Sequence, residues 1–315
     1  MPDWSKLQSD LLGVILSRMD LIEDYLNFSS VCKSWHSVAN EHNFISNLPR
    51  APWLMLAEED DGDEDDNTYR KFYSFYNDMI FKKRIPETRG KRCMESMGWL
   101  ITVEKENVSP IHFGHFSDVL YFNGNFYAVG YGGSIQVCDV SGPEPASSRI
   151  IVQLEPLGDY NYYILESLGS LFVVVQSGVG LRCVQDDHER ILLTYIPTVN
   201  DDEEDMSYAY GTINFVVFKI DLDAHRNTPI RDLGDRAFFL GANASFSVQA
   251  FQFPGIKPNH IYFTDNCLCA NFYFEEGGGL DMGVFNLANG SIQPHYDGVS
   301  LSLVCPPIWV TPTLC

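Results

Sequence analysis

The sequence predicts a multi-domain protein, in which a small all-α domain of three helices precedes an all-β propeller of about five to seven blades. Apolar residues recur at helical spacing through the first forty residues. The rest of the chain repeats strand pairs around glycine or Asn-Gly turns, as the blades of a propeller do. About 260 of the 315 residues follow Trp53, which allows five to seven blades at roughly 40 to 50 residues each.

The helical domain contains two amphipathic segments. Apolar side chains within residues 11–19, and again within residues 31–39, are spaced by one, three or four positions, which is the period of a helix. Residues 21–26 between them are long enough for a third, short helix. About forty residues in three helices form a weak independent domain, because so short a chain buries little apolar surface.

These helices carry more apolar side chains than a bundle of this size hides easily. We therefore expect part of this surface to bind a protein partner, and the alternative is a helical cap packed on the downstream domain. The apolar residues concerned are Leu7, Leu11, Leu12, Ile15, Leu16, Leu26, Val31, Cys32 and Trp35.

The β-rich part of the sequence reads as a series of hairpins. The clearest covers residues 118–129, because Asn123-Gly124 suits a two-residue turn in which both positions have positive φ. Residues 134–140 add a third antiparallel strand. A second hairpin covers residues 162–176, and residues 215–222 supply its outer strand.

Two further hairpins are predicted, at residues 236–248 and 261–292. The short strand within residues 306–312 is flanked by prolines, and we expect it to complete a blade that begins near Trp53. A pair of β-sandwiches is the alternative architecture. The propeller is favoured because radial repetition protects strand edges without long helices.

Two acidic stretches interrupt the strands. Residues 58–66 hold eight carboxylates in nine positions, and the second stretch covers residues 186–205. Such blocks repel themselves and stay solvated, so both are expected to be loops. A basic patch at residues 82–92 follows the first, and we expect the two to neutralise each other locally. The alternatives for this patch are an acidic partner and a nuclear import signal.

The overall charge excludes several classes of partner. The chain has 42 acidic and 21 basic side chains, which gives a formal net charge of −21. A nucleic-acid binder needs a basic footprint that replaces phosphate counterions, and an anionic membrane also attracts basic segments. We therefore expect neither nucleic acid nor a membrane as a partner.

The opening residues show no signal peptide, and the longest apolar runs, such as residues 171–175, are far too short to cross a bilayer. The eight cysteines lack C-x-x-C spacing, and we interpret them as reduced, buried thiols. Together these features predict an intracellular protein of the nucleus and/or the cytoplasm.

No catalytic constellation stands out in the sequence. His112 and His115 lie close together, but two imidazoles without a third ligand make a poor zinc site. The glycine-rich residues 130–133 and 277–279 open no helix after a strand and lack a following lysine, so we interpret them as turns. We therefore expect a non-enzyme with no catalytic residue, no cofactor and no metal.

The helical domain resembles an F-box. The match joins L-x-x-D-L-L-x-x-I-L-S-R-M, which starts at Leu7, to D-Y-L-x-F-x-x-V-C-K-S-W, which ends at Trp35. One departure is Gln8, where the family usually carries a proline that fixes the chain entering the first helix. The resemblance implies that residues 1–45 dock on the Skp-type adaptor of a cullin–RING ubiquitin ligase through the nine apolar residues named above.

We place the β-propeller domain at residues 46–315, and this region is similar to the propeller domain of a large plant F-box family, the kink-suppressor-type β-propellers. The resemblance spans residues 72–312 and implies a substrate receptor rather than a catalyst, with an unidentified protein substrate on the propeller. The motifs that carry it lie at residues 235–241, 253–265, 281–287 and 307–312.

Two of these motifs also support a physical prediction. Asp235 and Arg236 are expected to form a buried ion pair that braces a blade. Residues 253–255 and 257–259 are expected to form two tight turns, because proline sets φ and glycine or asparagine tolerates a positive φ.

Three functions remain open from the sequence. The first is a ligase receptor, in which the F-box holds the adaptor and the propeller loops hold a protein substrate. The second is a propeller-based enzyme or small-ligand binder, against which the lack of a convergent acid, base or metal set argues. The third is a degenerate family member that acts independently of a ligase, with Gln8 as its symptom.

Overall fold

A computed structural model describes most of the chain, and all statements below concern the residues that it describes. These are residues 3–19, 22–41, 51–58, 68–96, 99–104, 116–130, 132–139, 147–155, 161–179, 181–185, 191–195, 211–266, 278–296, 298, 300–302 and 306–311. Several features predicted above lie outside them, namely residues 59–66 of the first acidic stretch, residues 186–190 and 196–205 of the second, the two neighbouring histidines and the boundary between the two domains. Residues 191–195 of the second stretch form a strand, so the prediction of a loop is wrong there.

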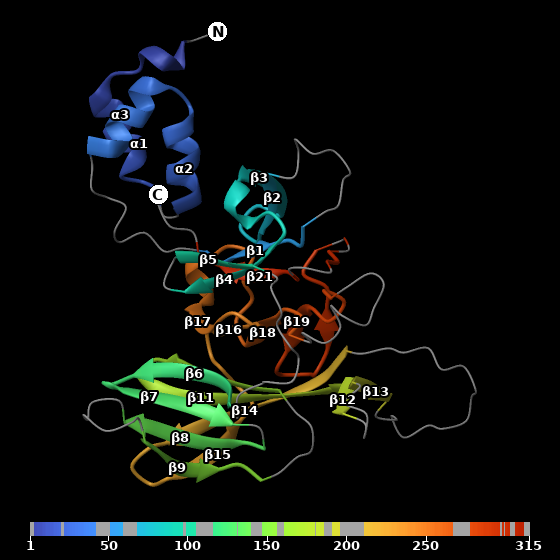
Figure 1. The fold of residues 1–315 in the computed structure, drawn as a ribbon. Coiled ribbons are helices and arrows are strands. Elements are labelled where there is room, and N and C mark those ends of the chain that lie inside the picture. Colours follow the sequence, from blue (N-terminus) through green and yellow to red (C-terminus); the bar gives the residue numbers. More distant parts are fainter. Residues whose placement is uncertain are drawn as a thin grey trace.

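Three helices form the N-terminal domain, as predicted. They are α1 (Ser9–Leu16), α2 (Ile22–Ser30) and α3 (Lys33–Glu41), and the 3₁₀ turn η1 (Trp4–Lys6) precedes them. Figure 1 shows these helices as a separate group at one end of the molecule, beside the β-sheets. The predicted all-α domain is therefore confirmed.

The remainder of the described chain forms five sheets and one separate hairpin. Sheet I has the order β21-β1-β2-β3, with β1 (Trp53–Met55), β2 (Tyr69–Ser74), β3 (Met79–Arg84) and β21 (Ile308–Val310). Sheet II pairs β4 (Lys91–Ser96) with β5 (Trp99–Glu104). Sheet III has the order β6-β7-β8-β9, with β6 (Phe116–Phe122), β7 (Asn125–Gly130), β8 (Ser134–Asp139) and β9 (Ser147–Gln153).

The other two sheets contain the second half of the chain. Sheet IV has the order β10-β11-β14-β15, with β10 (Asn161–Ser167), β11 (Ser170–Val179), β14 (Gly211–Asp221) and β15 (Arg226–Ile230). Sheet V has the order β17-β16-β18-β19-β20, with β16 (Arg236–Leu240), β17 (Ser245–Gln249), β18 (His260–Phe263), β19 (Gly283–Asn286) and β20 (Ile292–Gln293). The separate hairpin pairs β12 (Leu181–Gln185) with β13 (Ile191–Tyr195), and two 3₁₀ turns, η3 (Pro86–Thr88) and η4 (Ala250–Gln252), complete the described elements.

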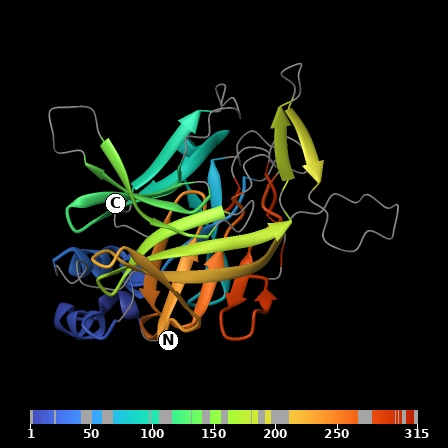
Figure 2. The same ribbon diagram turned by 90° about the horizontal axis from the view of Figure 1, so that it is seen from below.

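Hydrophobic clusters pack these sheets against one another in sequence. One cluster joins sheet II to sheet I, a second joins sheet I to sheet V, a third joins sheet V to sheet IV, and a fourth joins sheet IV to sheet III. Figures 1 and 2 show the resulting series of small, twisted sheets, from which the β12–β13 hairpin projects. Successive small sheets that share clusters are the arrangement predicted for a propeller. The blade number stays a prediction.

The predicted hairpins of sheets III and IV are confirmed. β6 and β7 pair around Asn123-Gly124, whose φ angles are 48° and 84°. β10 and β11 pair around Leu168-Gly169, with φ angles of 51° and 70°. β8 and β14 add the expected third strands, and β9 is a fourth strand that the sequence did not indicate.

The strands of the third and fourth predicted hairpins pair antiparallel as predicted, β16 with β17 and β18 with β19, but both pairs belong to one sheet. β16 and β17 are antiparallel as expected, but β18 pairs with β16 in parallel, with Ala237 opposite His260. A parallel neighbour needs a connection that carries the chain back along the sheet. β17 carries it back, and η4 with the two predicted turns then crosses the end of the sheet at which β16 begins. Gly255 and Asn259, at φ 90° and 58°, confirm both turns.

The predicted ion pair between Asp235 and Arg236 is wrong. Arg236 Nε donates to Ser247 Oγ at 2.9 Å, and Asp235 Oδ2 accepts from Gln249 Nε2 at 3.1 Å. Neighbouring residues of a strand point to opposite faces of its sheet, which favours separate partners. Both side chains therefore tie β16 to β17.

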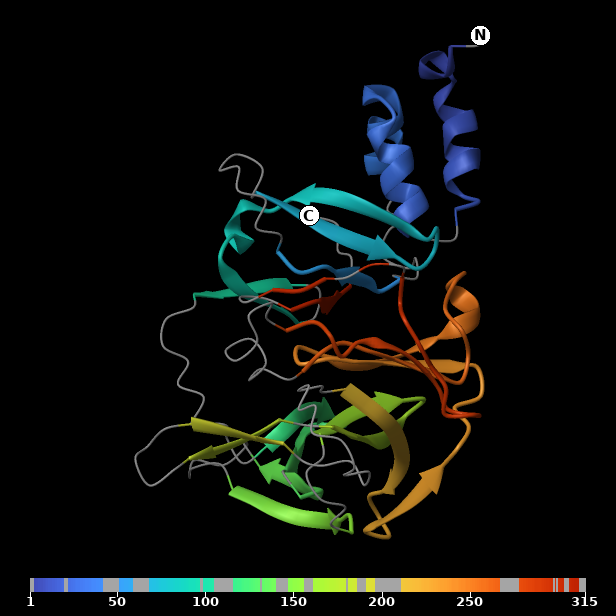
Figure 3. The ribbon, with the colours of Figure 1, turned by 90° about the vertical axis from the view of Figure 1, so that its right-hand side faces the viewer.

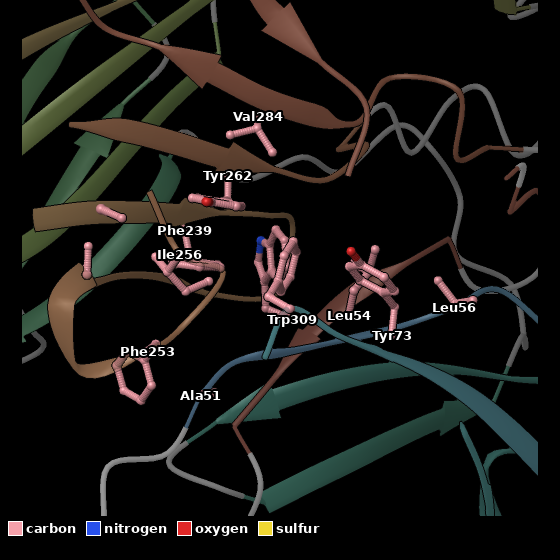
Figure 4. Close-up of a cluster of buried hydrophobic side chains, with 13 residues drawn as sticks. Ala51, Leu54, Leu56, Tyr73, Phe239, Phe253, Ile256, Tyr262, Val284 and Trp309 are labelled. Carbon is pink, nitrogen blue, oxygen red and sulfur yellow. The ribbon is translucent and has the colours of Figure 1, made fainter. Parts of the chain in front are cut away.

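The two ends of the β-rich region close on each other, as predicted. β21 pairs antiparallel with β1, with Trp309 opposite Leu54. Trp309 is fully buried, and its Nε1 donates to the carbonyl oxygen of Leu240 at 2.8 Å. Figure 4 shows its ring between Phe239 of sheet V and Leu54 of sheet I. Burial of a tryptophan from the end of the chain thus links its last strand to two sheets.

The helical domain meets the sheets at the turn between β2 and β3. The hydroxyl of Tyr76 in this turn donates to Asp24 Oδ2 of α2 at 3.3 Å. On its other side the turn packs against sheet V, because a Cβ added to Gly255 would lie 1.8 Å from the carbonyl oxygen of Phe75. In Figure 3 the helices stand directly above the β2–β3 hairpin.

Candidate adaptor interface

The three helices share a small apolar core. Two leucines of α1 face α2 and α3, where the Tyr25 hydroxyl donates to the Ala39 carbonyl oxygen. The fully buried members of this core are Leu12, Leu16, Tyr25, Phe28, Val38 and Ala39. Since this core is so small, each of its members contributes a large part of the stability of the domain.

Hydrogen bonds at the start of α3 fix the 3₁₀ turn η1 in place. Trp35 Nε1 donates to the carbonyl oxygen of Trp4 at 3.0 Å, and Ser34 Oγ donates to that of Ser5 at 3.1 Å. The Trp35 backbone N–H donates to Cys32 Sγ, and this bond lowers the pKa of the Cys32 thiol. Cys32 therefore caps α3 with its sulfur, in the manner of a polar N-cap residue.

A second face of α1 remains apolar and exposed. Leu11 is 50% exposed, and Val14 and Ile15 are exposed beside it. Their spacing of three and four residues places them on one side of the helix. Exposed Trp4 in η1 and Val31 between α2 and α3 add to the apolar surface of the domain. Five large exposed apolar side chains in so small a domain indicate a protein-binding surface.

The nine residues predicted for adaptor binding divide into groups. Leu11, Ile15 and Val31 are exposed, and Leu7, Cys32 and Trp35 are partly buried. Leu12 and Leu16 are fully buried in the domain core, so they shape the helix rather than present a surface. Leu26 belongs to α2, but its side chain lies outside the described residues.

Sequence reasoning missed Trp4 and Val14. Val14 follows Leu11 by three residues and so had a detectable signal in the helical period. Trp4 lies in a 3₁₀ turn too short to have a period. Its position on α3 depends on the hydrogen bond to Trp35, which the sequence gives no means to foresee.

A polar cluster lies between sheets IV and V of the β-rich region. Asp281 Oδ1 accepts from the Thr212 backbone N–H and Oδ2 from the Thr212 hydroxyl, both at 2.8 Å. Burial, and to a lesser extent the nearby Asp265 carboxylate, raise the pKa of Asp281 to about 6. Burial and the same carboxylates also raise the pKa of Tyr163, whose hydroxyl donates to Gln176 at 2.7 Å. These groups bind one another and orient no nucleophile.

Two other kinds of site were sought in the structure. The described part of the chain contains no group of three or more His, Cys, Asp or Glu side chains arranged to hold a metal ion. Among the same residues, no helix has the length and apolarity that spanning a bilayer requires. The apolar surface of the helical domain is therefore the strongest candidate site.

Comparison with known families agrees with the two-part architecture. Residues 4–50 match the F-box domain, and residues 104–286, more than half of the chain, match the KIB1-4 beta-propeller. The chain belongs to the F-box proteins with a KIB1-4 β-propeller. The three helices are thus the F-box, and sheets III to V, apart from strand β20, lie within the matched part of the propeller.

The chain is also similar to F-box proteins over nearly the whole of their length. The chain is 23% identical to F-box protein At2g26160 of Arabidopsis thaliana, across 84% of this chain and 96% of the relative. It is 22% identical to F-box protein SKIP23 of the same plant, across 99% and 96% of the two chains. F-box protein At4g35733 is also 22% identical, across 97% and 98%. The protein is therefore a plant-type F-box protein with a C-terminal propeller.

Proposed function

We propose that this protein is the substrate-recognition subunit of a cullin–RING (SCF-type) ubiquitin ligase. Its F-box would dock on a Skp-type adaptor, and through it on a cullin, while its propeller binds a protein substrate. The observation that carries the proposal is the exposed face of α1 at Leu11, Val14 and Ile15. The domain core does not use this face, and F-box domains generally bind Skp1-type adaptors within SCF complexes.

The proposal assigns no chemistry to this chain. F-box proteins are typically non-catalytic subunits, and the polar cluster around Asp281 is satisfied by Thr212 and Gln176 rather than poised to react. The propeller would contribute shape and loops, on which binding residues commonly lie. Such a receptor acts by holding two proteins close together, which raises the effective concentration of one at the other.

The ligase-independent alternative rests on Gln8. This residue precedes α1 with φ −64°, which is the value that proline would impose. Leu7 before it has φ −62° and ψ 138°, a conformation that tolerates a following proline. Glutamine therefore leaves the path into α1 unchanged and removes only rigidity, so Gln8 gives this alternative little support.

Binding of the purified full-length chain to a plant Skp-type adaptor tests the proposal. The double variant Leu11→Ser, Ile15→Ser removes the exposed α1 face. The matched control is Leu280→Ser, because Leu280 is also 50% exposed but belongs to the propeller. We expect micromolar or tighter binding by the wild type and the control, and loss of binding by the double variant. A folded wild-type protein that fails to bind the adaptor would refute the ligase role.

A further inference from the structure

The first strands of sheets III and IV and the edge strand β17 of sheet V lie together in the propeller. Asp118 Oδ2 on β6 accepts from the Ile164 backbone N–H on β10 at 3.0 Å and from the Ser245 hydroxyl on β17 at 2.8 Å. Further along, the hydroxyls of Ser167 and Ser247 are 2.9 Å apart. β10 and β17 therefore run in the same direction, and the β10–β11 turn and η4 lie at the same end of the propeller.

Leu168, in the β10–β11 turn, is unfavourable in two ways. It has φ 51°, in the left-handed region that disfavours residues with a side chain such as leucine. It is also 75% exposed, so that nearly all of an apolar side chain faces water. The equivalent position of the β6–β7 turn holds Asn123 at φ 48°, the residue that such a turn favours. A residue kept against local preference points to a role outside the fold.

Other apolar side chains are exposed at this end of the propeller. Phe251 in η4 is 72% exposed, and Tyr121 beside the β6–β7 turn is 62% exposed. Tyr121 pairs with the exposed Phe126 across the hairpin, with ring centroids 5.0 Å apart. Figures 1 and 2 show the β6–β7 turn at the same side of the molecule as β17 and the helices. We call Tyr121, Phe126, Leu168 and Phe251 the turn face.

Carboxylates flank the turn face. Glu166 is exposed two residues before Leu168, and its Oε1 accepts from the Gly169 backbone N–H at 2.7 Å. Asp235 is exposed beside η4, where its carbonyl oxygen accepts from the Ala250 backbone N–H at 2.8 Å. Arg236 directly follows Asp235 in the sequence and is partly exposed, but its Nε donates to the Ser247 hydroxyl rather than to a carboxylate. With a formal net charge of −21 on the whole chain, this surface attracts basic segments.

We propose that the turn face is the docking surface for a protein segment whose apolar side chains are flanked by lysine or arginine. Leu168 and Phe251 would be the anchors, since their side chains are the most exposed of the four, at 75% and 72%, and bury the most apolar surface when covered. Glu166 and Asp235 would select for the basic flanks. The inference rests on the proposed function only in that the docked protein would be the substrate of the ligase.

Leu168→Asn separates docking from folding. Asparagine suits the left-handed turn position better than leucine, so the variant raises the melting temperature of the protein while it removes one anchor. Phe251→Ser removes the other anchor. The control is Leu280→Asn. Leu280 precedes Asp281, whose carboxylate accepts from the Gln176 side chain, and Gln176 lies at the end of the β10–β11 hairpin that is opposite to Leu168.

The probe is a displayed library of random 12-residue peptides. The peptides are selected on the full-length chain in complex with its Skp-type adaptor, or on the full-length chain alone if it binds no adaptor. Peptides with apolar residues beside Lys or Arg are expected to be enriched. The affinities of the best peptides are measured by fluorescence anisotropy. These peptides should bind the double variant Leu168→Asn, Phe251→Ser at least tenfold more weakly than the wild type, and should bind Leu280→Asn as tightly as the wild type. Glu166→Gln, Asp235→Asn should reduce the preference for basic peptides.

Enrichment of acidic peptides, no enrichment, or equal binding by the double variant and the wild type would overturn the docking proposal. These outcomes leave adaptor binding untouched, so they do not bear on the ligase role. Conversely, loss of adaptor binding with intact peptide selection would refute the ligase role alone.

Discussion

Leu11 and Leu12 are neighbours in the sequence, yet the structure predicts opposite consequences for their replacement. Leu12 is 1% exposed and belongs to the core of the F-box, whereas Leu11 is 50% exposed on the face offered to the adaptor. Leu12→Ala should therefore unfold the domain. Leu11→Ala should leave it folded and weaken adaptor binding.

The magnitudes follow from burial. Leu12→Ala leaves a cavity in a closed core, and such changes cost about 2 to 5 kcal/mol. A helical domain of this size rarely has more than about 3 to 5 kcal/mol of stability, so the variant F-box is expected to be largely unfolded. Full burial of a leucine contributes about 1.5 to 3 kcal/mol. Leu11 is half buried, so Leu11→Ala should lower the free energy of unfolding by about 1 kcal/mol or less. The same change should weaken the binding free energy for the adaptor by a similar amount, which corresponds to a roughly fivefold weaker affinity.

Two measurements separate these effects. Thermal unfolding followed by circular dichroism at the helical wavelength reports the F-box, and titration calorimetry with the adaptor reports binding. We expect Leu12→Ala to lose the helical transition and binding together, and Leu11→Ala to keep the transition. If Leu12→Ala kept both its helices and full adaptor affinity, the assignment of Leu12 to the core would be refuted.

Three further changes test the propeller and the entry to α1. Gly255→Ala should lower the free energy of urea unfolding by at least about 3 kcal/mol, because φ is 90° and the added Cβ lies 1.8 Å from the Phe75 carbonyl oxygen. The control Gly290→Ala, at φ 74° with open space around it, should cost only about 1 kcal/mol. Equal costs for the two variants would contradict the close approach of Gly255 to Phe75. Burial raises the pKa of Asp281 from 3.8 to about 6, so the wild type should gain about 2 kcal/mol of stability relative to Asp281→Asn as the pH falls from 7 to 4. Parallel pH profiles of unfolding for the two proteins would refute this. Gln8→Pro should raise F-box stability by about 0.4 to 1 kcal/mol and tighten adaptor binding, and a lower melting temperature would show that the entry to α1 differs from that described.

The sequence predicted well whatever depends on neighbouring residues. Asn123-Gly124 defines its own turn, since both residues tolerate the positive φ that a two-residue hairpin requires. The turns at Gly255 and Asn259 follow from the same local chemistry. The three F-box helices follow from apolar period and length. The pairing of the last strand with the first followed from the expectation that a short strand flanked by prolines completes the blade that begins near Trp53.

Longer-range pairing was decided by tertiary structure. β18 pairs antiparallel with β19, as its place in the sequence suggests, but no local signal says that its other edge joins β16 in parallel. Likewise, Arg236 binds Ser247 across the sheet instead of its acidic neighbour in the chain. Alternation of side chains along a strand separates neighbours and brings distant residues together.

For the candidate site, the sequence by itself determined that α1 carries apolar residues on more than one side. Only the packing of α2 and α3 decided that Leu12 and Leu16 are buried while Leu11 and Ile15 face outward. A helical period shows which residues share a side, but two adjacent apolar sides are equivalent until a neighbouring helix covers one of them. Leu168 is the converse case. Its positive φ follows from a turn that the sequence placed correctly, whereas the position of that turn at the same end of the propeller as η4 exists only in the folded chain.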